Sequence, residues 1–343
     1  MAVRLAFAGT GWISKVHARA ARLLPQVEFA AVVNHRPESM QTFADEFSIP
    51  RTYEHLEDLL DDGGVDALVV STPNVLHASQ TVAALRAGVH VLVEKPTAMN
   101  AAQAYEMRQA SIETGSLLML AHNWRFHEET QWLREQVLNQ RLGKIIRTRG
   151  FSIHKDWGPA GWFTQKELAG GGALADMGVH AIDTARFLLG DPIPKSVFAR
   201  TGTHYMDADV DDTAELIINW EDGSYSHLEA GWWQPFSYGE EAAAGVYGSR
   251  GYGSVFPTRL KLRQPNGPVE MVYAGFPFPR REESVQQMYE NQMAYFIRCI
   301  QHNIKPTPGG TEGWINMLII DAAYQSSQSG EVVQIPGPLE GCY

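Results

Sequence analysis

The feature that most restricts the fold is a glycine-rich turn near the N-terminus. The turn consists of Gly9, Thr10, Gly11, Trp12, Ile13 and Ser14. It follows an apolar run at residues 3–8, which predicts a strand, and precedes a segment with apolar side chains at helical spacing. This is a G-x-G-x-x-G pattern with serine in the third place. Because Gly9 permits the tight turn and Gly11 lets a pyrophosphate approach the helix N-terminus, the pattern predicts dinucleotide binding.

The rest of the first half alternates between short buried strands and helices. Strands are predicted at residues 67–70, 89–93 and 117–120, and helices at residues 77–87 and 101–114. The strands are continuous apolar runs, which is typical of parallel sheets buried on both faces. Strand–helix alternation of this kind predicts an α/β fold with a doubly wound parallel sheet. We expect residues 1–121 to form an NAD(P)-binding Rossmann domain.

The strand at residues 89–93 ends abruptly in Glu94, Lys95 and Pro96. In open α/β sheets, ligands bind at the carboxyl ends of the strands. Lys95 is therefore a charged group placed by a rigid element at the rim of an active site, and Pro96 fixes the backbone behind it. The alternative interpretation is a solvated lysine in a surface turn.

The end of the second predicted strand, at residues 29–36, bears on the choice of cofactor. Rossmann proteins often place an acidic residue there to bind the ribose hydroxyls. This chain has Asn34, His35 and Arg36 instead. Asn34 carries no charge to repel a 2′-phosphate, and Arg36 could pair with that phosphate. The pattern favours NADP over NAD and permits both.

The pattern changes after residue 121, and we expect residues 122–343 to form a second, α+β domain for substrate binding and oligomerisation. Helices are predicted at residues 128–140, 174–188, 286–303 and 311–328, and strands at residues 144–154, 213–220, 224–231, 243–247, 260–263, 269–273 and 332–335. The segment Glu221-Asp222-Gly223 between two of these strands is a hairpin signal. A mostly antiparallel open sheet follows, with few helices left to cover its second face. Such a face predicts a homo-oligomer, either a dimer or a tetramer.

The helix predicted at residues 174–188 carries Asp176, His180 and Asp183 at positions i, i+4 and i+7. This spacing places the three side chains on one helix face. On a face turned toward a cleft, a carboxylate can orient the imidazole. Two other interpretations are a solvated salt-bridging strip and a metal site completed by His154 or His204, although the spacing matches no zinc pattern.

Composition excludes several classes of partner. The net charge of −11 opposes a general nucleic-acid or acidic-membrane surface. The two cysteines, Cys299 and Cys342, lack paired spacing and fit a reducing compartment. No apolar run approaches the length of a membrane helix, and the N-terminus has no basic leader, so we expect a cytoplasmic protein.

Four motifs together resemble the glucose–fructose oxidoreductase, inositol dehydrogenase and rhizopine-catabolism (Gfo/Idh/MocA) family. They are AGTGWIS, STPNVLH, EKP and GGALADMGVHAID, in the family's order and spacing. The resemblance implies a nicotinamide-dependent dehydrogenase or reductase in which Lys95 hydrogen-bonds the reacting oxygen and Asp176 and His180 contact the substrate. Trp162 is followed by Phe163 where the family often has Trp-Arg, and this affects the substrate contacts expected from that loop.

The expected reaction is hydride transfer between NADP or NAD and a secondary alcohol or ketone of a sugar or cyclitol. His180 would move the proton, Lys95 would stabilise the alkoxide-like oxygen, and Asp176 would fix the imidazole. Further candidates for a polyol pocket are Asn123, Arg125, His154, Lys155, Asp156 and Trp162. Two alternatives are a nucleotide-binding sensor without turnover and a redox-neutral, NAD-assisted sugar-processing enzyme. No metal is expected.

The residues assigned to the cofactor lie in four loops of the first domain and in the segment that follows it. They are Gly9, Thr10, Gly11, Trp12, Ile13, Asn34, His35, Arg36, Ser71, Thr72, Pro73, Asn74, His77, Glu94, Lys95, Pro96 and Asn123.

Overall fold

The computed structural model of this chain describes residues 2–236, 239–264, 267–276 and 283–336. It divides into two compact units, the first with residues 1–123 and 285–314 and the second with residues 124–284 and 315–343. The predicted boundary after residue 121 lies next to the first crossing between the units. The sequence pattern does not predict the return of residues 285–314 to the first unit.

The first unit is built on a six-stranded parallel sheet. Its strands are β1 (Val3–Ala8), β2 (Val27–Val33), β3 (Thr52–Tyr53), β4 (Ala67–Val70), β5 (His90–Val93) and β6 (Leu118–Leu120). Their order is β3-β2-β1-β4-β5-β6, which is that of doubly wound dinucleotide-binding sheets. Strand β4 is buried at all four residues because both faces of the sheet are covered. The predicted α/β class of this half is confirmed.

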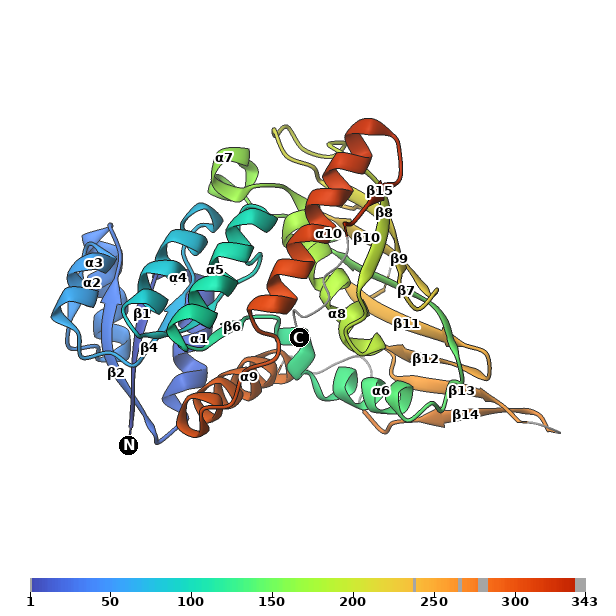
Figure 1. The fold of residues 1–343 in the computed structure, drawn as a ribbon, viewed down its shortest axis with the longest axis horizontal. Coiled ribbons are helices and arrows are strands. Elements are labelled where there is room, and N and C mark those ends of the chain that lie inside the picture. The colour runs from blue at the N-terminus through green and yellow to red at the C-terminus, as the bar shows by residue number, and fades with distance from the viewer. Residues whose placement is uncertain (1, 237–238, 265–266, 277–282, 337–343) are drawn as a thin grey trace. The chain divides into compact units, whose positions relative to one another are not determined.

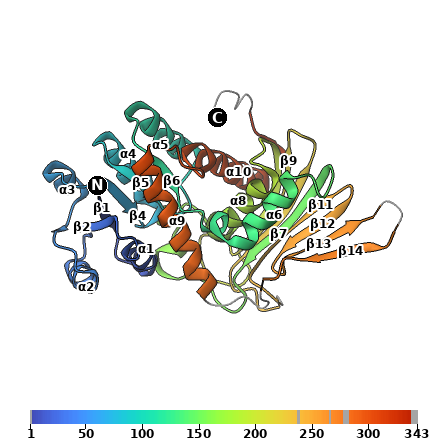
Figure 2. The same cartoon turned by 90° about the horizontal axis from the view of Figure 1, so that it is seen from below.

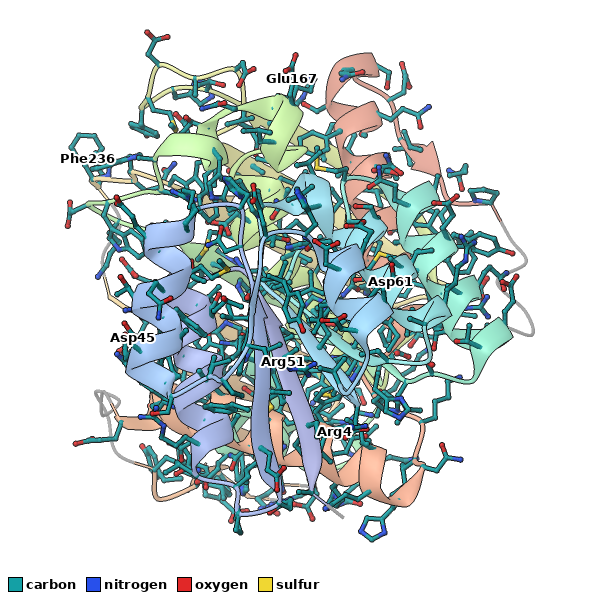
Figure 3. The ribbon with its side chains drawn as sticks, turned by 90° about the vertical axis from the view of Figure 1, so that its left-hand side faces the viewer. Arg4, Asp45, Arg51, Asp61, Glu167 and Phe236 are labelled. Atoms are coloured by element: carbon teal, nitrogen blue, oxygen red, sulfur yellow. The ribbon has the colours of Figure 1, made fainter. Side chains whose placement is uncertain are left out.

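Helices connect these strands and cover both faces. They are α1 (Trp12–Arg22), α2 (Pro37–Phe47), α3 (Leu56–Asp62), α4 (His77–Arg86) and α5 (Ala101–Thr114), joined late in the chain by α9 (Glu283–His302). Figure 3 shows Asp45 on α2 and Asp61 on α3 at opposite sides of the strands. Strands β1 and β4 are neighbours although their connections run to opposite sides, and ligands bind at such a switch point.

The second unit is built on a nine-stranded sheet. Its strands are β7 (Ile145–Ile153), β8 (Pro194–Gly202), β9 (Thr213–Trp220), β10 (Tyr225–Gly231), β11 (Ala242–Gly248), β12 (Gly251–Val255), β13 (Arg259–Arg263), β14 (Val269–Tyr273) and β15 (Val333–Gln334). Their order is β14-β13-β12-β11-β7-β10-β9-β8-β15. All described pairings are antiparallel except β7 with β10, which confirms the predicted mostly antiparallel sheet.

One face of this sheet carries helices α6 (Glu128–Leu138) and α8 (Val179–Leu189), which lie on the same side in Figures 1 and 2. Leu133 of α6 and Leu188 of α8 share a buried core with Val246 and Leu260 of the sheet. The opposite face has no helix among the described residues in Figure 1, and alternate residues of β9 are exposed there. The remaining helices are the short α7 (Lys166–Ala169) and the long α10 (Gly310–Ser329).

Strands β8 and β12 are absent from the sequence prediction. Two glycines in β12, Gly251 and Gly253, weaken its strand signal. A Cβ at Gly253 would lie 2.5 Å from Leu133, so this glycine makes room for α6 against the sheet. The predicted helix at residues 174–188 also differs, because it begins with a π-helical turn at Leu174–Gly178.

In the part of the chain that the structure describes, no helix combines the length and apolarity that a membrane crossing requires. Cys299 is buried and carries a free thiol, and Cys342 lies outside the described residues.

Candidate functional site

The glycine turn of the first unit has the geometry that a dinucleotide requires. Gly9 has a φ of +100°, and a Cβ there would lie 2.6 Å from the carbonyl oxygen of Ser71, so only glycine fits. Gly11 is the N-cap of α1, and a Cβ on it would meet no described atom within 4 Å. The N-terminus of α1 is therefore open to an anion, which its unpaired N–H groups favour.

Ser14 occupies the place of the third glycine. Its side chain is buried, and its Oγ lies 2.8 Å from Oγ of Ser71. The Ser71 hydroxyl in turn donates to the carbonyl oxygen of Ala8 at 3.2 Å. These bonds tie α1 to the ends of β1 and β4, so the serine replaces close glycine packing with a hydrogen-bonded link.

The end of β2, where the adenosine ribose is predicted to bind, is ordered by Asn34. The Nδ2 of this buried residue donates to Oγ1 of Thr10, and its Oδ1 accepts the backbone N–H of Arg36 at 3.1 Å. The Thr10 hydroxyl lies 2.6 Å from that of Ser39 on α2. Asn34 thus shapes the turn into α2, whereas the side chains of His35 and Arg36 are exposed.

His77 braces the loop after β4 against the loop after β5. Its Nδ1 lies 2.8 Å from the carbonyl oxygen of Pro96, and its Nε2 lies 2.9 Å from that of Thr72. Both oxygens only accept hydrogen bonds, so a neutral ring can donate to one of them at a time. Burial lowers the pKa of His77, which favours this neutral form. The predicted cofactor residues Ser71 and Asn74 of the first loop are also buried.

A buried ion pair supports the turn that carries Lys95. The Nε2 of His17, on α1, lies 2.7 Å from Oε1 of Glu94, and both side chains are buried. The other oxygen, Oε2, accepts the backbone N–H of Lys95 at 3.0 Å. Burial opposes ionisation of Glu94, but the hydrogen bond to His17 and the charges of His17 and Lys95 outweigh it, so the pKa of Glu94 lies below its ordinary value.

Helix α9 covers this ion pair within the first unit. The ring of Tyr289 meets that of His17 edge-on, with centroids 5.5 Å apart. Burial, reinforced by the nearby charge of Glu94, raises the pKa of the Tyr289 phenol, which therefore stays protonated. The sequence analysis names neither His17 nor Tyr289. A histidine in the second turn of the helix after the glycine turn is the only local sign of the pair.

Asn123, after β6, has an unused acceptor. Its Oδ1 is buried without a hydrogen-bond partner among the described residues. A carboxamide donates readily to such an oxygen. The glycine cradle, the open N-terminus of α1 and this acceptor together fit a nicotinamide dinucleotide.

In the second unit, Asp211 fixes the start of the helix that carries Asp176 and His180. Its Oδ1 accepts the backbone N–H of Gly172 at 2.9 Å and the hydroxyl of Tyr324 at 2.7 Å, and its Oδ2 accepts the N–H of Leu174 at 2.7 Å. A Cβ at Gly172 would lie 1.8 Å from the carbonyl oxygen of Asp211. Burial raises the pKa of Asp211. No local pattern identifies this cap from the sequence.

Asp176 lies within the π-helical turn and is held from the sheet. The indole N–H of Trp232, at the end of β10, donates to its Oδ2 at 3.0 Å. Trp232 is completely buried and Asp176 is 8% exposed, so the carboxylate is fixed at the edge of the interior. Single π-helical turns occur frequently at functional sites. Trp232 is a further residue that the sequence analysis does not identify.

His180 follows on α8 and is half-buried. It lines a cavity of about 20 Å³ together with Ser152 and Thr184, which is room for one water molecule. The hydroxyl of Ser152 is buried there without a hydrogen-bond partner in the described chain. One side of His180 therefore faces a small interior cavity.

Asp183 and Arg125 form an interior ion pair. Two guanidinium nitrogens of Arg125 donate to the two Asp183 oxygens at 2.7 and 2.8 Å, and one of them also reaches Asp191 at 2.7 Å. Asn316 donates to Asp183 at 2.9 Å. Asp183 thus stabilises the interior of the second unit. The sequence analysis places Arg125 in the substrate pocket, whereas in the structure its guanidinium forms these interior ion pairs.

Four other residues placed by sequence in the substrate pocket follow β7. They are His154, Lys155, Asp156 and Trp162. The ring of His154 stacks on Trp157 with centroids 3.5 Å apart, and that of Trp162 stacks on Phe163 at 3.9 Å. Asp156 is exposed. Across the described ranges, no three His, Cys, Asp or Glu side chains gather where they could hold a metal ion.

Comparison with known proteins matches a known family domain to each unit. Residues 3–122 match the oxidoreductase family with an NAD-binding Rossmann fold, and residues 130–253 match the GFO/IDH/MocA C-terminal domain. D-glucoside 3-dehydrogenase of Escherichia coli K12 is 30% identical, with 97% of each chain covered. 1,5-anhydro-D-fructose reductase of Ensifer adhaerens is 29% identical, with 90% of this chain and 91% of the relative covered. A levoglucosan dehydrogenase solved with NADH and levoglucosan superposes with a TM-score of 0.88 at 23% identity, covering 98% of this chain and all of the other.

Proposed function

Because the chain belongs to the GFO/IDH/MocA family of oxidoreductases, we propose that it oxidises a secondary ring hydroxyl of a glucoside with NADP or NAD, or reduces the corresponding ketone. The relative that is 30% identical over nearly the whole chain, a D-glucoside 3-dehydrogenase, supports this substrate class. The observation that carries the proposal is the Lys95 turn, whose carboxylate neighbour is fixed by a buried histidine.

Three side chains have separate roles in the proposed reaction. Bound nicotinamide accepts or supplies the hydride. Lys95, as an ammonium, stabilises negative charge on the reacting oxygen. His180 takes the hydroxyl proton during oxidation and returns it during reduction. Asp176, held by Trp232, orients the substrate beside His180.

For the cofactor, we propose a preference for NADP with NAD also accepted. Asn34 is uncharged and already bonded to Thr10, so nothing at this position repels a 2′-phosphate. Arg36 is exposed at the same turn and can pair with that phosphate. Ser39, in the first turn of α2, offers a further hydroxyl nearby.

The test is a change in nicotinamide absorbance with purified protein. The panel contains methyl D-glucosides, D-glucose and myo-inositol, each with NAD and with NADP. We expect turnover to be fastest with the glucosides. Cofactor binding without any absorbance change across the panel would contradict the proposal and support a sensor. Conversion of a sugar, seen by mass spectrometry without net absorbance change, would support the redox-neutral alternative.

We further propose a homo-oligomer formed through the open face of the nine-stranded sheet. This face holds a hollow of about 440 Å³, lined among others by Arg149, Phe151, Tyr247, Tyr252 and Arg259. An open sheet face with aromatic side chains and both signs of charge suits a self-complementary contact. Light scattering should give the mass of a dimer or tetramer at micromolar concentration. A monomeric mass for the wild type would overturn this assignment.

We also propose that the protein is located in the cytoplasm. The buried free thiol of Cys299 supports a reducing compartment. Fractionation of cells that express the tagged chain tests this, and recovery with a secreted fraction would contradict it.

A further inference from the structure

Aromatic side chains gather where two central strands of the second unit's sheet end. They belong to residues 154–157, after β7, and residues 233–236, after β10. Because β7 and β10 are adjacent and parallel, their C-terminal ends lie side by side, and both loops begin there. Trp157 is 49% exposed, Trp233 is 40% exposed and Phe236 is 81% exposed. Figure 3 shows Phe236 projecting outward from the ribbon. We call His154, Trp157, Trp233 and Phe236 the aromatic platform.

The first half of the platform is held by one carboxylate. Oε1 of Glu241 accepts the indole N–H of Trp157 at 3.0 Å and the backbone N–H of Lys155 at 3.2 Å. The ring of His154 stacks on Trp157 at an interplanar angle of 28°. An exposed indole usually samples several rotamers, whereas this one is fixed from its edge and from one face.

The second half is tied to the first through the backbone. The N–H of Trp233 donates to the carbonyl oxygen of Trp157 at 3.0 Å, and that of Gln234 donates to His154 at 3.1 Å. A Cβ at Gly158 would lie 2.4 Å from the Trp233 indole nitrogen, so this glycine gives the ring its place. The two loops therefore act as one surface.

The platform also adjoins Asp176. Trp233 has a φ of +54°, a left-handed conformation that bulky residues seldom adopt. The chain turns sharply there, and consecutive indoles take opposite roles. Trp232 is buried and donates to Asp176, whereas Trp233 is exposed on the platform. Strain retained at such a position is common beside functional sites.

We propose that the aromatic platform binds the second ring of a glycoside, either the aglycone or a second sugar, while the ring that reacts lies at Asp176. This rests on the proposed function and deepens it, since it assigns the enzyme to glycosides with a ring-shaped substituent. Flat aromatic faces pack against the C–H face of a sugar or against an aryl ring. The polar groups beside them, Glu241 and Lys155, suit the hydroxyls at the edge of such a ring.

The experiment compares phenyl β-D-glucoside with methyl β-D-glucoside. Wild type should have a kcat/KM about 10-fold higher for the phenyl compound, the scale of one added aromatic contact. Trp157→Ala should bring this ratio close to unity and leave kcat/KM for methyl β-D-glucoside within about 2-fold. Trp157→Phe, which keeps a ring, should retain part of the preference. Tyr105→Ala is the matched control, since Tyr105 is an exposed aromatic residue of the first unit.

Two results would overturn the platform. One is the same phenyl-to-methyl ratio in wild type and Trp157→Ala. The other is a smaller particle mass for Trp157→Ala by light scattering, because the rings would then belong to a contact between copies of the chain. If no glucoside is turned over, the proposed function fails, and calorimetric binding of phenyl β-D-glucoside to wild type and Trp157→Ala still decides the platform. Equal affinities there would contradict it.

Discussion

The six-stranded sheet of the first unit is covered on both faces, whereas the nine-stranded sheet of the second is covered on one. In the first unit, only the strand ends remain for ligands, and its proposed functional groups lie in short segments after β1, β2, β4, β5 and β6. In the second unit, they come from a helix, from loops distant in sequence and from an exposed face. The fully covered sheet thus has its candidate groups in local motifs, whereas the candidate groups of the partly covered sheet are spread along the chain.

The most severe test of this comparison removes one group from each unit. Lys95→Met and His180→Gln should each lower turnover by roughly 10²–10⁴-fold, because charge stabilisation and proton transfer are lost separately. Titration with NADPH should give nearly unchanged affinity for both variants. Near-normal turnover in His180→Gln would remove this residue from the mechanism and leave the first unit as the only source of catalytic groups.

A second test compares ion pairs. Arg125→Met leaves the buried Asp183 without its cation, whereas Asp191 keeps its ion pair with Arg134. We expect a loss of about 3–5 kcal/mol in the free energy of unfolding. The control, Arg4→Met, removes the exposed pair of Arg4 with Asp66 in the first unit, which is 2.7 Å long. Solvent screening should leave the urea midpoint of this control almost unchanged. Equal shifts for both variants would mean that the interior pair has no special structural role.

The same contrast explains how much the sequence predicts. β4 has its predicted bounds at Ala67–Val70, and α5 has its at Ala101–Thr114, because short apolar runs and periodic segments carry their own signal. The Gly9 turn can be predicted for the same reason, because its glycine spacing is a local signal. The predicted mostly antiparallel sheet is also confirmed, although two of its strands carry too little apolar alternation to be identified.

What the sequence does not disclose depends on partners distant along the chain. The pair of His17 with Glu94 spans 77 residues, and that of Asp176 with Trp232 spans 56. No spacing rule connects such residues. The π-helical turn at Leu174–Gly178 is hidden too, because it depends on a wider backbone turn and not on apolar periodicity.

A third test concerns the end of β2. If Arg36 pairs with a 2′-phosphate, Arg36→Ala should lose on the order of 1.5–3 kcal/mol in kcat/KM with NADP and little with NAD. The measurement is the ratio of kcat/KM for the two cofactors. Glu38→Ala, an exposed change in the first turn of α2, is the control. Equal losses with both cofactors, or no loss, would leave Arg36 without a part in cofactor choice.

The smallest effect concerns pH. Burial lowers the pKa of His77, so the unfolded chain binds a proton that the folded chain does not, and stability rises with pH. Above the ordinary histidine pKa of about 6.5, the burial of His77 does not lower the free energy of unfolding. As the pH falls from there toward the lower pKa of the folded state, this free energy decreases. His90, whose pKa burial also lowers, acts in the same direction.

His77→Gln should reduce the slope of unfolding free energy against pH below that point by up to about 1.4 kcal/mol per pH unit. Urea unfolding between mildly acidic and neutral pH measures this slope. The exposed His55→Gln serves as the control. An unchanged slope in His77→Gln would show that the brace between the two loops is not proton-linked.

The return of α9 to the first unit has a consequence for biosynthesis. Tyr289, which lies against His17, leaves the ribosome after the whole sheet of the first unit and nearly all strands of the second. Until then the nascent Rossmann sheet lacks the helix that covers its internal ion pair. A nascent chain stalled before residue 285 would thus contain an incomplete nucleotide-binding unit. We expect chaperones to bind such a chain until translation is almost finished.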